Sequence, residues 1–389
     1  MPGERAGPLA GLRIVEFAGI GPGPFCGMML ADHGAEVIRV DRAGARSGLQ
    51  PDPTKDVLAR GRKSIALDLK SEEGIALARK LCASADGLIE GFRPGVMERL
   101  GLGPDVLLAD NPRLVYGRMT GWGQTGPYAP HAGHDINYIA LGGALAHFGR
   151  ADDKPTPPIN MVGDFGGGGM MLAFGMVSAL LHVAHGGSNE RRGQVIDAAM
   201  TDGTAVLMGM IQGFANQGMW REDRGANLLD TGAHFYDTYE TADGKFVSIG
   251  SIEPQFYAEL RARLGLAEDS EFDAQMNPAQ WPVLKEKLAA IFKGKTRAEW
   301  DDLLEHTDVC YAPVLTMSEA REHPHNAARG TFVEIAGSPQ PAPAPRYSGT
   351  ATATPQAAVA PGADSDAILD GLGIDADQIA ALRRSGTVS

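Results

Sequence analysis

The chain has 389 residues and a formal net charge of −13, and 43% of its residues are hydrophobic. This length is enough for two or three domains with a sizeable core. The acidic balance argues against general nucleic-acid binding, which needs concentrated positive charge. We find no run of about twenty apolar residues, and the first residues lack the basic start and apolar middle of a signal peptide. We therefore expect a cytoplasmic protein that binds neither nucleic acid nor a membrane.

The N-terminal third alternates between short apolar segments, typical of strands, and helical segments. The predicted strands are residues 12–17, 36–40, 64–69, 86–90 and 114–119, and the predicted helices are residues 25–32, 71–84 and 94–100. Such alternation points to a mainly parallel sheet. Ligands bind at the carboxyl ends of the strands of such a sheet, where Arg42 and residues 91–93 and 119–123 stand.

The turn after the first strand resembles a dinucleotide-binding fingerprint, because it is rich in glycine and Asp41 follows the second strand. Two prolines argue against that function. Pro24 stands where the third glycine should be, and Pro22 removes a backbone donor. We therefore predict an α/β protein whose large domain is Rossmann-like but has no dinucleotide site.

Positive charge is concentrated in the first quarter of this acidic chain, at Arg42, Arg60, Arg62, Lys63, Lys70, Arg93 and Arg99. Each residue alone is most simply a solvated surface charge. As a cluster they indicate a phosphate-bearing ligand, since guanidinium groups bind phosphate through two parallel hydrogen bonds. The three cysteines, Cys26, Cys82 and Cys310, fit neither a disulfide framework nor a metal site.

The sequence predicts a large Rossmann-like domain over residues 1–190, completed by residues 325–389. A linker with a long helix is expected over residues 191–224, and a small α+β domain over residues 225–324. The small domain is indicated by a hairpin pattern, strands at 235–240 and 245–249 around an Ala-Asp-Gly turn.

Two short segments carry residue types that proton transfer at carbon needs. The first, Gly133-His134-Asp135-Ile136-Asn137-Tyr138, places an imidazole beside a carboxylate. The second, residues 160–164, ends in Asp164 before a glycine-rich apolar helix that runs to about residue 185. The glycines indicate close packing, because they are poor helix formers. Each segment alone has a simpler interpretation, a turn or a helix cap, but together they supply two different proton carriers.

Several motifs occur in one order, at residues 12–16, 91–96, 99–103, 120–127, 133–138, 163–168 and 252–257. On these motifs, residues 8–350 resemble the α-methylacyl-CoA racemases of the class III, or formyl-CoA-type, CoA-transferase superfamily. The resemblance implies chemistry at the carbon next to a CoA thioester. It also implies an interlocked homodimer, in which the partner's small domain closes each site.

The site residues follow from the same resemblance. His134 and Asp164 match the racemase proton carriers, Glu253 matches the residue that hydrogen-bonds the histidine, and Asn160 matches the asparagine beside the aspartate. The positions that match CoA contacts are Arg42, Leu67, Asp68, Leu69, Lys70, Gly91, Phe92, Arg93, Arg99, Gly133, Ile136, Asn137 and Tyr138.

Racemisation needs two groups that flank one carbon, because a proton leaves one face and another returns to the opposite face. His134 backed by Glu253 can serve as base or acid, and the helix dipole holds Asp164 as a carboxylate. Backbone N–H groups near Asp135 can bind the enolate oxygen. We therefore predict interconversion of (2R)- and (2S)-2-methylacyl-CoA with no metal or other cofactor, CoA being part of the substrate.

CoA transfer between carboxylic acids is the alternative. In the transferases that the chain resembles, an aspartate that matches Asp135 is the nucleophile. The imidazole of His134 and the second carboxylate at Asp164 favour the racemase, since transfer needs neither. A CoA-binding module without catalysis would perform neither reaction.

Overall fold

The computed structural model describes residues 6–44, 52–187 and 191–389. The chain forms two compact units. The large unit comprises Met1–Gly142, Ile159–Leu207 and Ala328–Ser389, and the second unit comprises Gly143–Pro158 and Met208–Ala327. The predicted segment 191–224 is thus divided between the units, because its strand joins the large sheet and its second helix belongs to the second unit.

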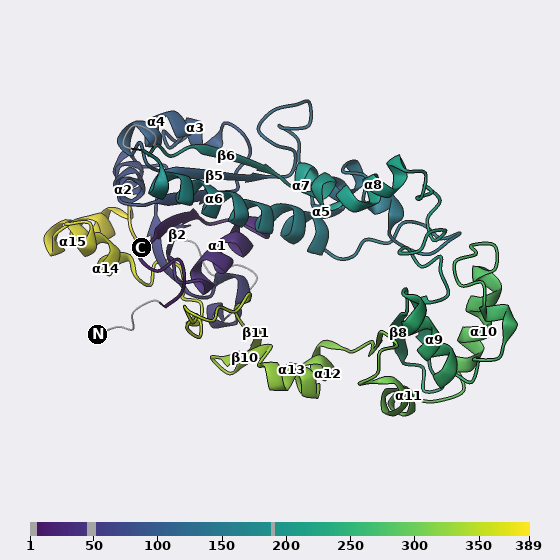
Figure 1. Ribbon diagram of the computed structural model, residues 1–389. Helices are drawn as coiled ribbons and strands as arrows, with labels where there is room; N and C mark the ends of the chain where they lie inside the picture. The colour runs from purple at the N-terminus through teal and green to yellow at the C-terminus, as the bar shows by residue number, and fades with distance from the viewer. Residues whose placement is uncertain (1–5, 45–51, 188–190) are drawn as a thin grey trace. The chain divides into compact units, whose positions relative to one another are not determined.

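A six-stranded parallel sheet is the centre of the large unit (Figure 1). Its order is β3-β2-β1-β4-β5-β6, and each neighbouring pair runs parallel. The strands are β1 (Arg13–Phe17), β2 (Glu36–Arg42), β3 (Arg62–Leu67), β4 (Gly87–Glu90), β5 (Val115–Thr120) and β6 (Val195–Ala199). The predicted α/β fold with a Rossmann-like parallel sheet is confirmed.

Two cores lie on opposite faces of this sheet, because alternate residues of a strand point to opposite sides. Ile14 of β1 joins the core with α1 and α6, whereas Val15 joins the core with α2, α14 and α15. The helices of the unit are α1 (Pro22–Asp32), α2 (Glu72–Ala83), α3 (Val96–Arg99), α4 (Pro104–Asp110), α5 (Asp135–Leu141), α6 (Met171–His185), α7 (Met200–Leu207), α14 (Ser365–Gly371) and α15 (Ala376–Ser385).

The C-terminal segment packs on the outer strand β3. The carboxylate of Asp364 accepts the backbone N–H of Ser64 (2.9 Å), and the hydroxyl of Ser365 accepts the backbone N–H of Ala66 (3.2 Å). Earlier in this segment, β10 (Phe332–Ile335) and β11 (Ser338–Pro341) form an antiparallel pair.

The segment before α6 differs from the prediction. Met161–Met170 form a π-helix, η4, so the helical stretch begins earlier than expected and Asp164 lies in its first turn. Neighbouring backbones touch its glycines. A Cβ on Gly167 would lie 2.8 Å from the backbone nitrogen of Thr204 in α7, and one on Gly169 would lie 2.8 Å from the backbone oxygen of Pro22 in α1. The close packing expected from these glycines is confirmed.

The helical stretch Met161–His185 contains an 18-residue window with a mean hydropathy of 1.6 and is long and apolar enough to cross a membrane by length and composition alone. The sequence predicted an apolar helix here, but not one long and apolar enough to meet these criteria. Half of its most apolar window is buried inside the protein, where Leu172 and Met176 pack against the sheet. A buried core helix meets the same criteria of length and composition.

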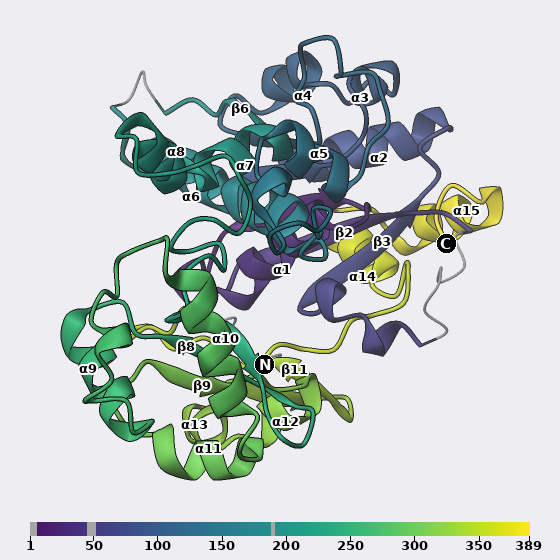
Figure 2. The same cartoon turned by 90° about the vertical axis from the view of Figure 1, so that its right-hand side faces the viewer.

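The second unit has its own core (Figure 2). Three antiparallel strands, β7 (Tyr236–Glu240), β8 (Phe246–Gly250) and β9 (Tyr311–Pro313), pack against helices through Phe235, Trp281, Phe292 and Trp300. The helices are α8 (Gly209–Asn216), α9 (Pro254–Arg263), α10 (Trp281–Phe292), α11 (Arg297–Leu304) and α12 (Met317–Glu322), and α13 (Pro324–Arg329) leads back to the large unit. The predicted hairpin is confirmed, whereas the predicted long helix is broken into α7 and α8.

Candidate active site

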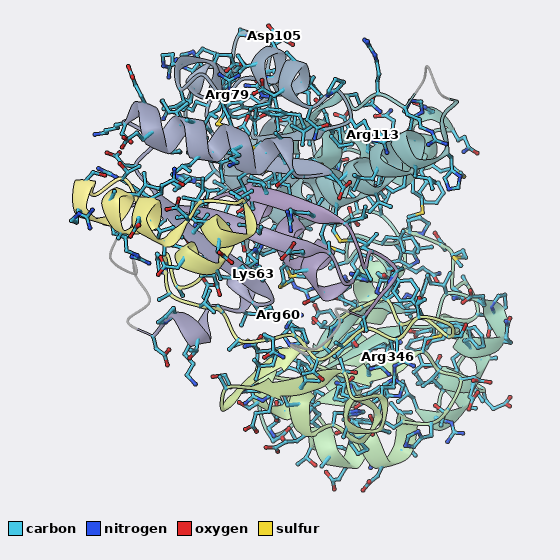
Figure 3. The ribbon with its side chains drawn as sticks, turned by 90° about the vertical axis from the view of Figure 1, so that its left-hand side faces the viewer. Arg60, Lys63, Arg79, Asp105, Arg113 and Arg346 are labelled. Atoms are coloured by element: carbon cyan, nitrogen blue, oxygen red, sulfur yellow. The ribbon has the colours of Figure 1, made fainter. Side chains whose placement is uncertain are left out.

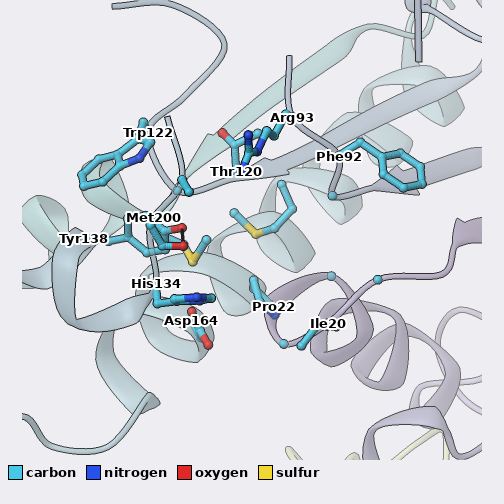
Figure 4. Close-up of a pocket in the computed structure, with 18 of the residues that line it drawn as sticks. Ile20, Pro22, Phe92, Arg93, Thr120, Trp122, His134, Tyr138, Asp164 and Met200 are labelled. Carbon is cyan, nitrogen blue, oxygen red and sulfur yellow. Dashed lines mark hydrogen bonds between the residues drawn. The ribbon is translucent and has the colours of Figure 1, made fainter. Parts of the chain in front are cut away.

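A pocket of about 380 Å³ opens at the carboxyl ends of β1, β4 and β5 (Figure 4). Its walls are the segments that follow these strands, residues 19–24, 91–94 and 120–122, together with the start of α5 and Asp164. Open parallel sheets bind ligands at this edge. The pocket therefore lies where the strand pattern predicted a ligand site.

His134 stands immediately before α5. Its backbone N–H donates to Oδ1 of Asn137 (3.0 Å), which holds His134 extended, with φ −135°, at the start of the helix. The side chain is exposed and lines the pocket. No side chain of the described residues hydrogen-bonds its ring.

Asp164 lies beside His134 in the same pocket (Figure 4). Burial raises the pKa of this carboxyl, and the charge of Asp135 raises it further. A hydrogen bond from Nδ2 of Asn160 to Oδ2 (3.0 Å) and the charge of His134 oppose this shift in pKa. The net direction is upward, so Asp164 holds a proton more readily than an ordinary aspartate, and the expectation that the helix dipole holds it as a carboxylate is wrong. Such a carboxyl suits both the removal and the return of a proton.

Asp135 lies outside the pocket, unlike its neighbour His134. It is buried (7% exposed) and is not among the residues that line the pocket. Its Oδ1 accepts the backbone N–H of Asp164 (2.7 Å), which links the start of α5 to the first turn of η4. Within the described residues, its Oδ2 is buried without a hydrogen-bond partner. Asp135 therefore holds Asp164 in place and does not present a nucleophile to the pocket.

Of the other predicted catalytic residues, Asn160 contacts Asp164 directly. Glu253 belongs to the second unit, where it is exposed and immediately precedes α9. Its contact with the imidazole of His134 stays a prediction.

The predicted CoA contacts fall into two groups within the large unit. Gly91, Phe92, Arg93, Gly133 and Tyr138 line the pocket with His134 and Asp164, and Ile136 and Asn137 follow on the exposed side of α5. A second group, Arg42, Leu67, Asp68, Leu69 and Lys70, stands at the paired ends of β2 and β3. Arg99 is exposed on α3. Leu67 is fully buried, backbone included, so the structure does not favour a direct ligand contact at this residue.

The phosphate prediction is wrong for Arg60 and Arg62, whereas it stays a prediction for Lys63, whose side chain is 45% exposed. Arg60 is paired with Asp32 (2.5 Å), Arg62 with Glu16 (2.5 Å) and Lys63 with Glu36 (2.6 Å), so their charge is neutralised within the protein. Figure 3 shows Arg60 and Lys63 on the large unit. The two arginines are buried, and a buried ion pair holds elements together because neither partner can lose the other without a large cost.

The sequence did not mark out some other residues that line the pocket, among them Ile20, His131 and Met200, whereas Thr120 lies in the range 119–123 that was predicted at the ligand-binding edge. Trp122 packs edge-on against Tyr138, with ring centres 4.8 Å apart. Among residues 6–44, 52–187 and 191–389, no three His, Cys, Asp or Glu side chains are grouped so that they could hold a metal ion.

Comparison of the chain with known families gives a result that fits the parallel sheet and the pocket at its edge. Residues 9–366 match CoA-transferase family III, and the chain belongs to this family. It is 50% identical to the α-methylacyl-CoA racemase of Mus musculus and 48% identical to that of Homo sapiens, each over 337 residues, which are 86% of this chain and 85% of the relative. A solved structure of a CaiB/BaiF family protein from Brucella suis covers 95% of this chain and 100% of its own, with a TM-score of 0.80 and 27% identity.

Proposed function

We propose that this chain is an α-methylacyl-CoA racemase, which interconverts (2R)- and (2S)-2-methylacyl-CoA thioesters. The observation that carries the proposal is the placement of His134 and Asp164, an imidazole and a carboxyl, in one pocket of the large unit. The identity of about half of all aligned residues to two mammalian racemases supports it.

Proton transfer through an enolate accounts for this pair of residues. In one direction, His134 removes the α-hydrogen as a proton, the electron pair of the C–H bond passes to the thioester oxygen as an enolate, and Asp164 returns a proton to the opposite face. In the other direction the two residues exchange roles. The raised pKa of Asp164 lets it act as the acid as well as the base.

The enolate oxygen needs hydrogen-bond donors. The first N–H groups of a helix have no acceptor inside that helix, and α5 begins at Asp135, directly after His134. These groups can stabilise the negative charge as it develops. The proposal requires no metal and no redox cofactor, because the thioester itself supplies the electron sink and CoA is part of the substrate.

The homodimer remains part of the proposal. One side of α6 exposes Phe174 (74%), Val177 and Leu181 (57%), which recur at the spacing of a single helical stripe. An apolar stripe of this size on a surface marks an interface, and we assign it to a second copy of the chain. The partner's small domain would bring Glu253 to the imidazole of His134. The free thiols of Cys26, Cys82 and Cys310 are in keeping with the proposed cytoplasmic location.

Incubation of one 2-methylacyl-CoA enantiomer in D₂O, without any carboxylic acid as acceptor, tests the proposed activity. A racemase incorporates deuterium at the α-carbon and loses the chirality of the substrate. A substrate that keeps its α-hydrogen and its configuration would overturn the proposal.

The CoA-transferase alternative predicts no change until an acceptor such as succinate is added, and then transfer of CoA through Asp135. The burial of Asp135 and its bond to the backbone of Asp164 argue against it, since a nucleophile must reach the thioester carbonyl.

A further inference from the structure

Arg118, a buried residue of β5, joins two carboxylates from different elements of the large unit. Its Nε donates to Oε1 of Glu90, the last residue of β4 (3.0 Å), and its Nη1 and Nη2 donate to the two oxygens of Glu98 in α3 (2.9 and 3.2 Å). The second oxygen of Glu90 accepts the backbone N–H of Phe92 (2.7 Å). One guanidinium therefore fastens both ends of residues 90–98.

This segment forms one wall of the pocket. Residues 91–94 line it, whereas Arg118, Glu90 and Glu98 do not. Figure 4 shows Arg93 at the pocket wall, and Arg99 directly follows Glu98 on α3. No carboxylate of the described residues forms an ion pair with Arg93 or Arg99. The guanidinium groups of Arg93, within the segment, and of Arg99, directly after it, are thus open to an external anion.

We infer that Arg118, with Glu90 and Glu98, is a positioning group for the phosphates of CoA. By fixing both ends of residues 90–98, it directs Arg93 and Arg99 towards those phosphates. This inference rests on the proposed function, in which the segment contacts CoA. Arginine suits the task because its planar fork makes two-point bonds that a lysine cannot make. The ion pair between Arg118 and Glu90 is also stable, since separation of its partners leaves a buried charge without a counter-charge.

Glu98→Gln and Arg118→Lys test the inference with two substrates, a 2-methylacyl-CoA and the same acyl group on pantetheine, which lacks the nucleotide phosphates. The side chain of Glu98 is 46% exposed, so its substitution leaves the fold intact. Both variants should raise KM for the CoA thioester about tenfold, because a rise of this size corresponds to the loss of one charge-assisted hydrogen bond. The kcat and the KM for the pantetheine thioester should stay at the wild-type values.

Arg79→Lys is the matched control. Arg79, labelled in Figure 3, makes a two-point pair with Asp110 (2.8 and 2.8 Å) on the same unit but away from the pocket lining. Its substitution should change neither KM. An equal rise in KM for both thioesters in Glu98→Gln would contradict the inference, because the segment would then not act through phosphate.

Calorimetric titration of CoA itself separates this inference from the proposed activity. If the wild-type protein binds CoA but racemises no substrate, weaker CoA binding in Glu98→Gln still supports the positioning role. Unchanged CoA affinity in both Glu98→Gln and Arg118→Lys would overturn it.

Discussion

At the scale of the single residue, opposing influences act on the pKa of the Asp164 carboxyl. Burial and Asp135 raise the pKa of its carboxyl, and the hydrogen bond from Asn160 lowers it. Asn160→Ala removes the larger of the two lowering influences, so the pKa of Asp164 rises and the carboxylate is lost at a higher pH. In the direction in which Asp164 removes the α-proton, the acidic limb of kcat/KM against pH should move to higher pH. At a pH on that limb, kcat/KM should fall about tenfold.

Asn326→Ala is a suitable control for this pH profile. Nδ2 of Asn326 donates to the backbone oxygen of Ala320 (2.8 Å) in the second unit, so its loss removes an equivalent amide hydrogen bond without touching Asp164. An acidic limb that stays in place in Asn160→Ala would show that the amide does not stabilise the carboxylate.

The sequence indicated which two proton carriers share one pocket, but it did not indicate their hydrogen-bond partners. His134 and Asp164 stand in motifs that can be read along the chain, and the pocket contains both. The bond between Asp135 and the backbone of Asp164 joins residues from two separate segments, so only the folded chain reveals it. The phosphate prediction failed at Arg60 and Arg62 for the same reason, since Asp32 and Glu16 lie on other elements.

At the scale of elements, the turn between β1 and α1 fits closely against the side chain of Asp164. Gly21 has a left-handed backbone (φ 72°), and a Cβ there would lie 3.2 Å from Oδ2 of Asp164. Gly21→Ala should therefore strain the turn by about 1 kcal/mol and displace the carboxyl. We expect kcat to fall about tenfold, as small misplacements of catalytic groups commonly do.

Gly11→Ala separates strain from displacement. Gly11 has a comparable left-handed backbone (φ 90°), but a Cβ there would meet no atom within 4 Å. Thermal unfolding should show a similar loss of stability in both variants, whereas kcat should fall in Gly21→Ala alone. Equal kcat in the two variants would mean that Gly21 serves the turn and not Asp164.

Strands and helices of the large unit were predictable because apolar periodicity and helix caps are local signals. Ser71 illustrates this, since its hydroxyl caps α2 by accepting the backbone N–H of Gly74 (3.0 Å). The π-helix Met161–Met170 was not predictable, because its backbone conformation accompanies the packing of α1 and α7 on its glycines. Tertiary contacts of this kind leave no periodic trace in a sequence.

At the scale of the whole molecule, the apolar stripe on α6 predicts association. The wild-type chain should sediment at twice its monomer mass, and Phe174→Asp should sediment as a monomer, because a buried unpaired charge opposes the interface. Val283→Asp is the control, since Val283 is the one large apolar residue exposed on α10. If the wild-type chain sediments as a monomer, or if Phe174→Asp sediments as a dimer, the apolar stripe on α6 is not the dimer interface.

Racemisation by the proposed mechanism requires that His134 and Asp164 serve opposite faces of one carbon. The most direct measurement follows α-hydrogen exchange of each enantiomer separately, in D₂O, with His134→Ala and with Asp164→Ala. We predict that neither variant racemises the substrate, and that each still exchanges the α-hydrogen of one enantiomer, a different one for each variant. Racemisation at the wild-type rate by either variant, or exchange of the same enantiomer by both, would contradict the two-base mechanism.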